Sequence, residues 1–378
     1  MLKETTHWYF NLPKFHSQIE KFLQNCMHLN ESARNFAKKM VEEGLKPRCI
    51  TRDIEWGIPA EPIFEGAEGK VLYVWAENIL GYLSATKEWA ECTGRPKEWR
   101  KLWQDKNTKT VFCIGKDNII FHTIIFPALL MATHEPYVLP YGITVTEFMM
   151  FENQPFSKSK GVGIGAEEAL EVSPADYWRY FLIIERPETK DLSFTWERFV
   201  ERVNTDLNNL LGNFVHRTLT LIYREFNKKV PAQSHLKDED EELLGLIALS
   251  ARKQAELIEN FKFRDSLDAV FSLARAGNTY LSSRKPWHTI KKNKESAGTT
   301  LNISVQVVNA LAIMIQPYLP TTAKNIRKML SLPEKMQEDE FERIGNSPIP
   351  ADHPILEPRV LFRKLNKYEI LKKLNRVV

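Results

Sequence analysis

The sequence has few cysteines, and their spacing excludes two kinds of small-domain scaffold. Its 378 residues contain only Cys26, Cys49, Cys92 and Cys113, and no two of them form a C-x-x-C pair. A disulfide framework and a zinc knuckle are therefore not indicated, and we expect no zinc in this chain. A reducing, cytoplasmic setting follows by default.

Other absences narrow the function classes. We expect no membrane span and no secretory segment, because no apolar run reaches spanning length and the N-terminus lacks an apolar signal region. The sequence contains no G-x-x-x-x-G-K-[ST] run, so it has no P-loop. The net charge of +4 neither requires nor excludes RNA, so any RNA contact must come from local patches. The composition is that of a soluble globular protein, and the length allows two or three domains.

The most informative stretch, residues 156–161, reads Phe-Ser-Lys-Ser-Lys-Gly and is followed by Gly163 and Gly165. Lysine provides a mobile charge with three donors, and glycines let backbone amides approach a ligand closely. The pattern suits transient contact with a polyphosphate. The alternative is a solvated basic loop, since short motifs match by chance.

The rest of the chain divides into two patterns. In residues 49–151, Lys70–Trp75 and Thr110–Gly115 are short apolar runs typical of buried parallel strands, separated by helical segments. This alternation favours an α/β layer, where ligands bind beyond the carboxyl ends of the strands. From Thr195 to about residue 335, four amphipathic helical segments predict an antiparallel α-bundle. We expect the charged residues beyond 335 to form a solvated helix, and the alternatives are packing against the sheet or contact with RNA.

The signature stretch closely resembles the Lys-Met-Ser-Lys-Ser loop of class I aminoacyl-tRNA synthetases. The flanking sequence is similar to methionyl-tRNA synthetase in particular, in the family's order from about residue 5 to 330. The matching runs are Thr6–Phe10, Cys49–Asp53, Trp56–Pro59, Tyr73–Trp75, Gly81–Thr86, Ile114–Asp117, Phe121–Thr123 and Leu211–Phe214.

The resemblance implies a fold class and a domain order. We expect α/β structure first, as the second half of a Rossmann-like class I catalytic domain with a parallel sheet, and then an all-α anticodon-binding bundle. The expected parts are residues 1–151 (catalytic half), 152–195 (signature loop and linker), 196–335 (bundle) and 336–378 (charged tail).

The resemblance also implies an enzyme, a methionine–tRNA ligase of protein biosynthesis. Such an enzyme activates methionine with ATP and Mg²⁺ to methionyl-adenylate and transfers the methionyl group to tRNA-Met. Its partners are methionine and tRNA-Met, without DNA or a membrane.

The resemblance assigns site residues by their matching positions. Lys158 is the expected catalytic residue, within a positively charged hairpin that closes over the nucleotide. The expected ATP-binding set is Ser157, Lys158, Ser159, Gly115 and Asp117. The expected methionine-binding set is Trp75, Tyr82, Asp117, His122 and Phe126. The expected anticodon-reading set is Asn213, Arg217 and Trp287, and no residue is expected to bind a metal.

Several of these residues also have an ordinary structural interpretation. Trp75 and Phe126 are common core residues, and His122 can be a satisfied helix histidine. Asp117 can serve as an N-cap. Arg217 can be a surface charge, and Trp287 can close a helix end, although an exposed Trp beside lysines favours RNA.

The sequence also departs from the family pattern. The family's His-Ile-Gly-His turn and zinc insertion are absent, so we expect activity to need an N-terminal synthetase piece, either as a separate chain or joined to this one. Pro155 replaces the first signature lysine, and residues 76–79 read Ala-Glu-Asn-Ile where the family has an apolar residue and Asp-Ala-Pro. An alternative is therefore a catalytically silent paralogue that binds tRNA through its bundle, and a third possibility is a scaffold protein.

Overall fold

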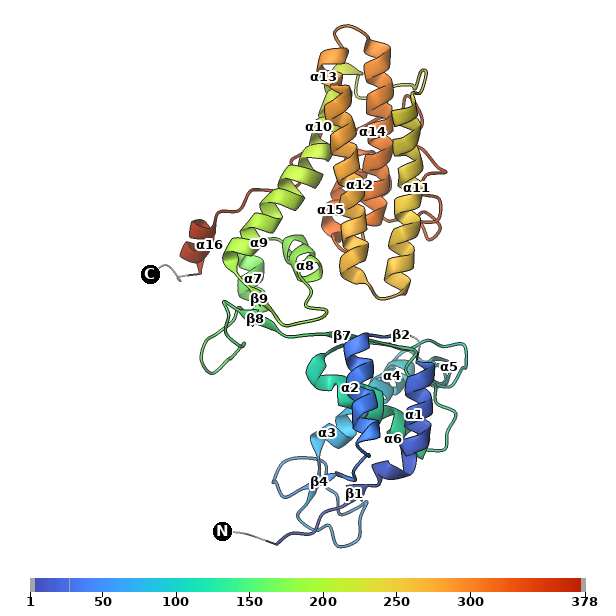
Figure 1. Ribbon diagram of the computed structural model, residues 1–378, viewed down its shortest axis with the longest axis vertical. Coiled ribbons are helices and arrows are strands. Elements are labelled where there is room, and N and C mark those ends of the chain that lie inside the picture. Colours follow the sequence, from blue (N-terminus) through green and yellow to red (C-terminus); the bar gives the residue numbers. More distant parts are fainter. Residues whose placement is uncertain (1–3, 27, 375–378) are drawn as a thin grey trace. The chain divides into compact units, whose positions relative to one another are not determined.

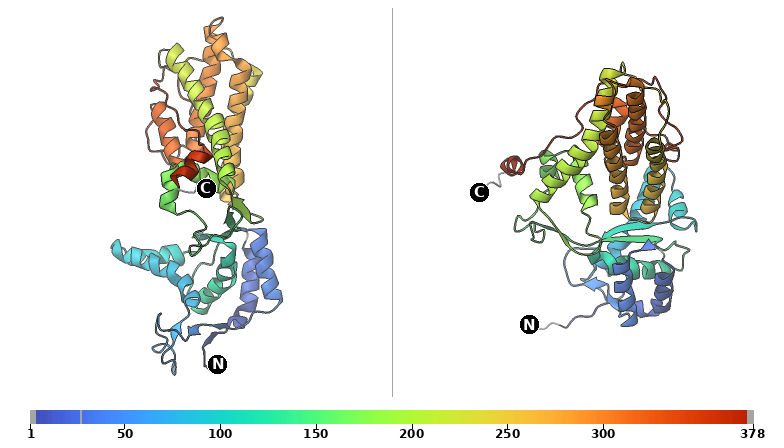
Figure 2. Two further views of the ribbon diagram at one scale, coloured as in Figure 1. Left: turned by 90° about the vertical axis from the view of Figure 1, so that its left-hand side faces the viewer. Right: turned by 45° about the horizontal axis from the view of Figure 1, so that its top comes forward.

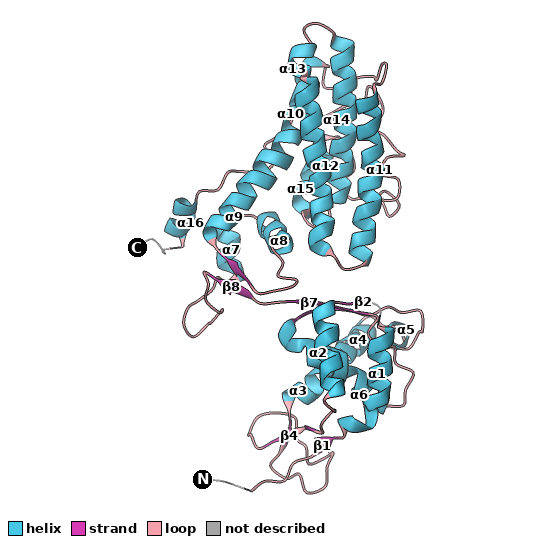
Figure 3. Cartoon of the chain, viewed as in Figure 1, coloured by secondary structure: helices cyan, strands magenta, loops and turns pink. Residues whose placement is uncertain are grey.

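The computed structural model describes residues 4–26 and 28–374. The chain divides into two compact units. Unit 1 comprises Met1–Phe148 with Glu188–Lys190, and unit 2 comprises Met149–Pro187 with Asp191–Val378. Each unit is described by itself below, and Figure 3 shows that unit 2 is built mainly from helices.

Unit 1 contains the parallel sheet that the sequence predicts. Strand β6 (Val111–Gly115) pairs with β7 (Gly142–Thr146), and β2 (His28–Leu29) pairs with the other edge of β7. Helices α1 (His16–Asn25) and α2 (Glu31–Glu42) pack together beside this sheet (Figure 1). Their buried faces meet β7 in one core, which includes Ile19, Ala33, Ala37, Ile124 and Ile143. A parallel strand at residues 110–115 is thereby confirmed, but its predicted burial is wrong, because Phe112 is the one buried residue of β6.

The predicted parallel strand at Lys70–Trp75 is wrong. Only β5 (Val71–Leu72) is extended, and it pairs antiparallel with β4 (Thr51–Arg52) outside the parallel sheet. Val74 and Trp75 are exposed and begin a short helix, α3 (Val74–Glu77). The run pairs with β4 for only two residues and then enters α3, where the Trp75 ring stacks on Phe121.

The remaining elements of unit 1 are two strands of two residues and several helical segments, of which the longest has 12 residues. Strand β1 (Tyr9–Phe10) follows the N-terminal residues and pairs antiparallel with β3 (Arg48–Cys49). The other helical elements are η1 (Leu12–Phe15), η2 (Asn78–Leu80), α4 (Gly81–Cys92), α5 (Glu98–Trp103), η3 (Lys116–Asn118), the π-helix η4 (Phe121–Ile125) and α6 (Phe126–Ala132).

Unit 2 begins with a small parallel sheet of β8 (Met149–Phe151) and β9 (Leu192–Phe194). An aromatic cluster covers this sheet and joins it to the helices, with Phe151, Trp178, Phe194, Trp196 and Phe199 all buried. The helices around it are α7 (Ala166–Val172), α8 (Ala175–Ile184), α9 (Trp196–Arg202), the π-helix η5 (Val203–Gly212) and α10 (Asn213–Glu225).

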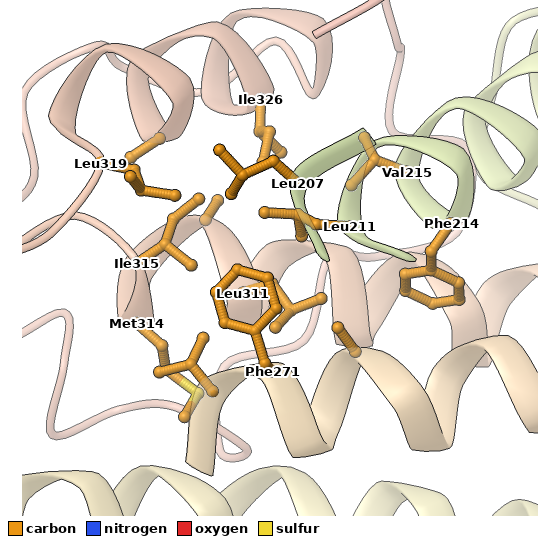
Figure 4. Packing of buried hydrophobic residues seen from close by; sticks show 14 of the residues in the cluster. Leu207, Leu211, Phe214, Val215, Phe271, Leu311, Met314, Ile315, Leu319 and Ile326 are labelled. Atoms are coloured by element: carbon orange, nitrogen blue, oxygen red, sulfur yellow. The ribbon is translucent and has the colours of Figure 1, made fainter. Parts of the chain in front are cut away.

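The bundle predicted for the second half of the chain is present. Helices α11 (Asp238–Glu259), α12 (Phe263–Arg284) and α14 (Lys294–Met314) lie side by side in Figures 1 and 2, with α13 (Pro286–Thr289) and α15 (Pro320–Met329) completing the unit. Figure 4 shows the interior, where Leu207 and Leu211 from η5 meet Leu311 and Ile315.

Helix α14 corrects one expectation from the sequence. By length and composition it is apolar enough to cross a membrane, although no run of spanning length was expected. Inside the bundle 94% of its apolar window is buried by neighbouring helices. Its apolar character is that of a central core helix.

The C-terminal tail is packed, so the expected solvated helix is wrong. Phe362 and Ile370 are only 1% and 3% exposed, the latter within α16 (Lys367–Lys373). Asn208 donates from Nδ2 to the Phe362 carbonyl at 2.7 Å, and Asn204 exchanges hydrogen bonds with the backbone of Leu365. The apolar positions in this charged segment therefore attach it to η5.

Candidate active site and anticodon site

The signature stretch forms a hairpin in unit 2, as predicted. Ser157 and Val162 exchange two backbone hydrogen bonds of 2.9 Å and 3.0 Å. A third bond of 3.2 Å, from the Gly161 amide to the Lys158 carbonyl, closes the turn. Gly161 has φ +65°, a left-handed conformation that glycine adopts without strain. The sequence Lys-Ser-Lys-Gly therefore builds the turn locally.

A second tight turn precedes the hairpin. Phe151 and Gln154 exchange backbone hydrogen bonds of 2.8 Å and 2.9 Å, and φ is 48° at Glu152 and 63° at Asn153. Positive φ at both central residues defines a type I′ turn, which asparagine tolerates. Pro155 follows directly and supplies no donor. The backbone that leads into the hairpin is therefore conformationally restricted, and Pro155 stands where the family has its first lysine.

The tip of the hairpin offers a cation to solvent. Lys158 is exposed, and no ion pair involves it in the part of the chain that the structure describes. The Ser157 and Ser159 hydroxyl oxygens are 3.2 Å apart, so the two hydroxyls lie together. A Cβ on Gly163 would come within 2.6 Å of the Phe156 ring, so that glycine lets the base of the hairpin pack. This arrangement can contact an anionic ligand.

Unit 1 brings Tyr82 and His122 into contact. His122 lies in η4 and is 4% exposed. Its Nδ1 is 3.0 Å from the Asn118 carbonyl oxygen, which only accepts, so Nδ1 carries the proton. Nε2 then accepts from the Tyr82 hydroxyl at 3.0 Å. Burial lowers the pKa of His122 and raises the pKa of Tyr82, so both side chains are held neutral.

Aromatic rings surround this pair. The Tyr82 ring centroid is 5.1 Å from that of Phe112 and 6.0 Å from that of Phe126, both edge-on. Ile79 is buried in the same cluster, while Asn78 is exposed. The departure at residues 76–79 therefore places an isoleucine against these rings and leaves the asparagine outside.

Trp75 borders a neighbouring cavity. Its ring stacks on Phe121 with centroids 5.1 Å apart, and it is 41% exposed. Arg52 and Tyr73 also line this cavity, and the Arg52 guanidinium lies 3.8 Å from the Tyr73 ring centroid. The cavity has a volume of about 410 Å³, within the range of small-molecule sites. Its lining also includes Tyr9, Phe10, Arg48, Ile50, Ile120, Ile125 and Leu129.

Gly115 and Asp117 form one local unit at the end of β6. A Cβ on Gly115 would lie 2.8 Å from Asp117 Oδ1, so only glycine leaves room for this carboxylate. Asp117 is exposed and accepts a hydrogen bond from the Asn118 side-chain amide at 3.1 Å. It is not the N-cap of the following turn, because Gly115 occupies that position. The carboxylate is thus placed beyond a strand end, where ligands bind in parallel sheets.

The bundle brings two of the three predicted anticodon residues together. The Arg217 guanidinium lies 4.6 Å from the Trp287 ring centroid, a cation–π contact. Trp287 was expected to be exposed, but it is half-buried and packs against the core. Asn213 is exposed one turn before Arg217 on α10. A base that stacks on Trp287 would therefore compete with the guanidinium for the ring or stack beside it.

Sequence reasoning missed three neighbours of these residues. Phe112 completes the cluster around Tyr82, Phe121 stacks on Trp75, and Arg52 covers Tyr73. The adjacency of Phe121 to His122 was a usable signal for Phe121, whereas the run Val-Phe-Cys-Ile-Gly of β6 has no alternation that singles out Phe112. Arg52 is brought to Tyr73 by the pairing of β4 with β5, which the sequence did not predict.

Among the residues described, no three His, Cys, Asp or Glu side chains cluster as metal ligands. A magnesium ion typically keeps several waters and binds through substrate phosphates. Such an ion would therefore be held mainly by a bound nucleotide.

Two family descriptions match the chain. Residues 1–219 match "tRNA synthetases class I (M)", and residues 230–376 match "Anticodon binding domain of methionyl tRNA ligase". The structure also resembles that of Mycobacterium tuberculosis methionyl-tRNA synthetase in complex with methionyl-adenylate, with a TM-score of 0.83 and 24% identity. That likeness covers 95% of this chain and 69% of the other, and it confirms the fold.

Curated relatives are similar along nearly the whole chain. The methionine–tRNA ligase of Thermofilum pendens is 43% identical over 369 residues, which cover 98% of this chain and 64% of the relative. The methionine–tRNA ligase of Sulfurisphaera tokodaii is 43% identical over 381 residues, which cover 100% of this chain and 66% of the relative. The chain therefore spans about two thirds of the length of these relatives.

Proposed function

The chain belongs to the methionine–tRNA ligase family of class I tRNA synthetases, and from this premise we propose that it takes part in charging tRNA-Met with methionine. In the first step the methionine carboxylate attacks the α-phosphate of ATP, and pyrophosphate leaves with the bonding electrons. In the second step a hydroxyl of the terminal tRNA adenosine takes the methionyl group and releases AMP. Both steps proceed mainly by positioning and charge neutralisation.

The observation that carries this proposal is the hairpin Ser157–Val162, with an exposed lysine at its turn. Lys158 would neutralise charge that develops on the phosphates, and Ser157 and Ser159 would donate hydrogen bonds to phosphate oxygens. Gly115 would let the nucleotide approach the backbone beside Asp117. Magnesium bound to the phosphates would supply further charge neutralisation.

The unit 1 residues would bind methionine. A thioether prefers aromatic walls, which the exposed rings of Trp75 and Tyr82 would provide, with the buried side chains of His122 and Phe126 supporting Tyr82 from behind. The neutral state of the Tyr82–His122 pair suits this apolar side chain, because neither group brings a charge. The exposed carboxylate of Asp117 would pair with the α-ammonium group.

We further propose that activity requires a segment equivalent to the remaining third of the relatives. The support is the absence of a His-Ile-Gly-His turn from the sequence, together with the 64% coverage of the Thermofilum pendens relative. This segment would be provided in cis or as a separate chain. We expect the assembled enzyme to work in the cytoplasm, together with the other components of protein synthesis.

The test is reconstitution. The chain is mixed with the N-terminal third of the Thermofilum pendens relative, and ATP–pyrophosphate exchange is measured with and without methionine. We expect exchange that depends on methionine and on both pieces. A folded, stable complex of the two pieces without exchange would refute the catalytic proposal.

A second candidate is a tRNA-binding paralogue without catalysis. The observation that favours it is Pro155 in the signature loop, combined with an intact Arg217–Trp287 contact in the bundle. It predicts that the chain alone binds tRNA with a CAU anticodon, while the reconstituted complex performs no exchange. Binding that ignores the anticodon would exclude this candidate.

A further inference from the structure

Unit 1 carries a pair of helices whose outer part neither proposed site uses. Helices α4 and α5 pack against each other as a hairpin, and Figure 2 (left) shows this hairpin in light blue, extending away from the rest of unit 1. Residues 87–109 contain seven Lys or Arg and four Asp or Glu. The hairpin is therefore a local patch of positive charge in a chain of low net charge.

The turn between the two helices places a cation over an exposed tryptophan. Gly94 has φ +70°, the Arg95 amide donates to the Ala90 carbonyl at 2.8 Å, and the Gly94 amide donates to the Glu91 carbonyl at 3.0 Å. These bonds form a Schellman motif, which reverses the chain at the end of α4. The Arg95 guanidinium thereby lies 5.0 Å from the ring centroid of Trp89, which is 41% exposed.

A second tryptophan of the hairpin has similar surroundings. The Trp99 ring centroid lies 4.6 Å from Lys87 Nζ and 5.0 Å from the Arg100 guanidinium. In the part of the chain that the structure describes, neither cation makes an ion pair, although Glu88 and Glu91 are exposed on the same hairpin. The two cations contact an aromatic ring instead of a carboxylate, so they remain available to an anionic ligand.

Exposed rings with attached cations fit single-stranded nucleic acid. Bases stack on aromatic side chains, and Lys and Arg contact the phosphates of the backbone. The bundle has the same combination in the Arg217–Trp287 contact. An acidic peptide would use the cations but would leave the tryptophan rings without a stacking partner.

The position of Trp89 on α4 indicates which single strand would bind. Tyr82 lies in the first turn of this helix, and Trp89 follows seven residues later. Seven residues are close to two helical turns, so the two side chains share one face of α4 about 10 Å apart along its axis. A strand whose last nucleotide reaches the Tyr82–His122 pair can therefore pass over Trp89.

We propose that this hairpin binds the unpaired 3′ end of a tRNA, with Trp89 stacking on a base and Arg95 and Arg100 contacting phosphates. The identity of the RNA rests on the proposed function, in which the terminal adenosine takes the methionyl group beside Tyr82. The contact is separate from the anticodon site in the bundle. The competing explanation is a solvated charged hairpin, which would not distinguish one RNA end from another.

The test uses two fluorescent minihelices made from the acceptor arm of tRNA-Met. One keeps the unpaired 3′ end and the other is blunt, and neither has an anticodon. By fluorescence anisotropy we expect the full chain to bind the first about tenfold more tightly, because stacking needs an unpaired base. Polyglutamate should compete poorly, because it has charge without rings. Equal affinity for the two minihelices would overturn the proposal, and so would competition by polyglutamate as strong as that by the unpaired end.

The matched variants for the ring are Trp89→Ala and Trp56→Ala. Trp56 is also in unit 1 and is 85% exposed, so its variant should bind as the wild type does. Trp89→Ala should lower the affinity about tenfold and remove the preference for the unpaired end. The Trp89 ring lies outside the buried clusters of the described residues, so the fold should persist. A folded Trp89→Ala variant that keeps the preference would refute the assignment, and the two minihelices on the wild type decide the question if that variant fails to fold.

The matched variants for the charge are Arg95→Gln and Arg264→Gln. Arg264 is exposed on α12 in unit 2 and makes no ion pair among the described residues. Each phosphate contact to a single strand contributes about 0.7 to the slope of log affinity against log salt concentration. We expect Arg95→Gln to reduce this slope by about that amount and Arg264→Gln to leave it unchanged. Equal slopes would exclude Arg95 from the contact.

This test and the reconstitution test can fail separately, because ATP–pyrophosphate exchange involves no RNA. Methionine-dependent exchange without a preference for the unpaired end would refute the hairpin contact alone. A preference for the unpaired end without exchange would refute the catalytic proposal and leave the contact standing.

Discussion

Replacing Tyr82 by Phe tests the hydrogen bond at the centre of unit 1. The substitution keeps the ring contacts and removes only the hydroxyl that donates to His122 Nε2 at 3.0 Å. His122 is 4% exposed but Tyr82 is 42% exposed, so water replaces that donor only in part. A buried acceptor left without its partner costs about 1–3 kcal/mol, which lowers the protection of the surrounding amides about 5- to 150-fold.

Hydrogen exchange measured by mass spectrometry checks this prediction with two controls. Peptides from α4 and α6 should exchange faster in Tyr82→Phe, whereas peptides from α11 in unit 2 should not change. Tyr9→Phe is the matched variant, since Tyr9 is 58% exposed and should behave as the wild type. If Tyr82→Phe protects α6 as well as Tyr9→Phe does, the Tyr82–His122 bond does not stabilise unit 1.

Three further results are expected. The pKa of His122 lies below its ordinary value of 6.5, so the unfolded chain binds a proton at this residue more readily than the folded chain does. The unfolding free energy of unit 1 should therefore fall as pH drops below 6.5, and His122→Gln should reduce this dependence on pH. Gly277→Ala should destabilise the bundle by about 1–3 kcal/mol in denaturant unfolding, because the new Cβ would lie 2.6 Å from the Phe214 ring. Gly245→Ala, with no neighbour within 4 Å, should instead be neutral or stabilising. Trp287→Ala should weaken binding of tRNA with a CAU anticodon about tenfold in a filter-binding assay, and equal binding by both proteins would contradict the anticodon assignment.

Much of the fold follows from periodicity along the chain. The bundle helices are strongly patterned and long enough to bury their apolar faces, and the apolar run Val111–Gly115 indicates a strand although only Phe112 in it is buried. The prediction of a parallel strand at Lys70–Trp75 failed because the partner strand, β4, lies some twenty residues away in the sequence and pairs antiparallel. A short apolar run carries no information on pairing direction. The prediction of a solvated tail failed because Asn204 and Asn208 on η5 hydrogen-bond to the backbone of the tail, and composition does not reveal such bonds.

The residues of the candidate site could be predicted from the sequence, but their geometry could not. The hairpin around Lys158 follows from local sequence, since Gly161 supplies the left-handed turn position. The proton position on His122 depends on the Asn118 carbonyl, which the π-helix η4 brings within reach. Trp287 is half-buried because it packs against the bundle core, and it meets Arg217, which lies more than sixty residues away in the sequence. Contacts of this kind are set by packing, beyond what local pattern encodes.

The most direct test compares Lys158→Ala with Lys160→Ala in the complex reconstituted with the relative's N-terminal third. Both lysines are exposed in the same turn, so loss of general positive charge affects them equally. The measurement is the rate of methionine-dependent ATP–pyrophosphate exchange. We predict a loss of about 100- to 1000-fold for Lys158→Ala and a far smaller change for Lys160→Ala. Equal rates in the two variants would contradict a catalytic role for the hairpin lysine.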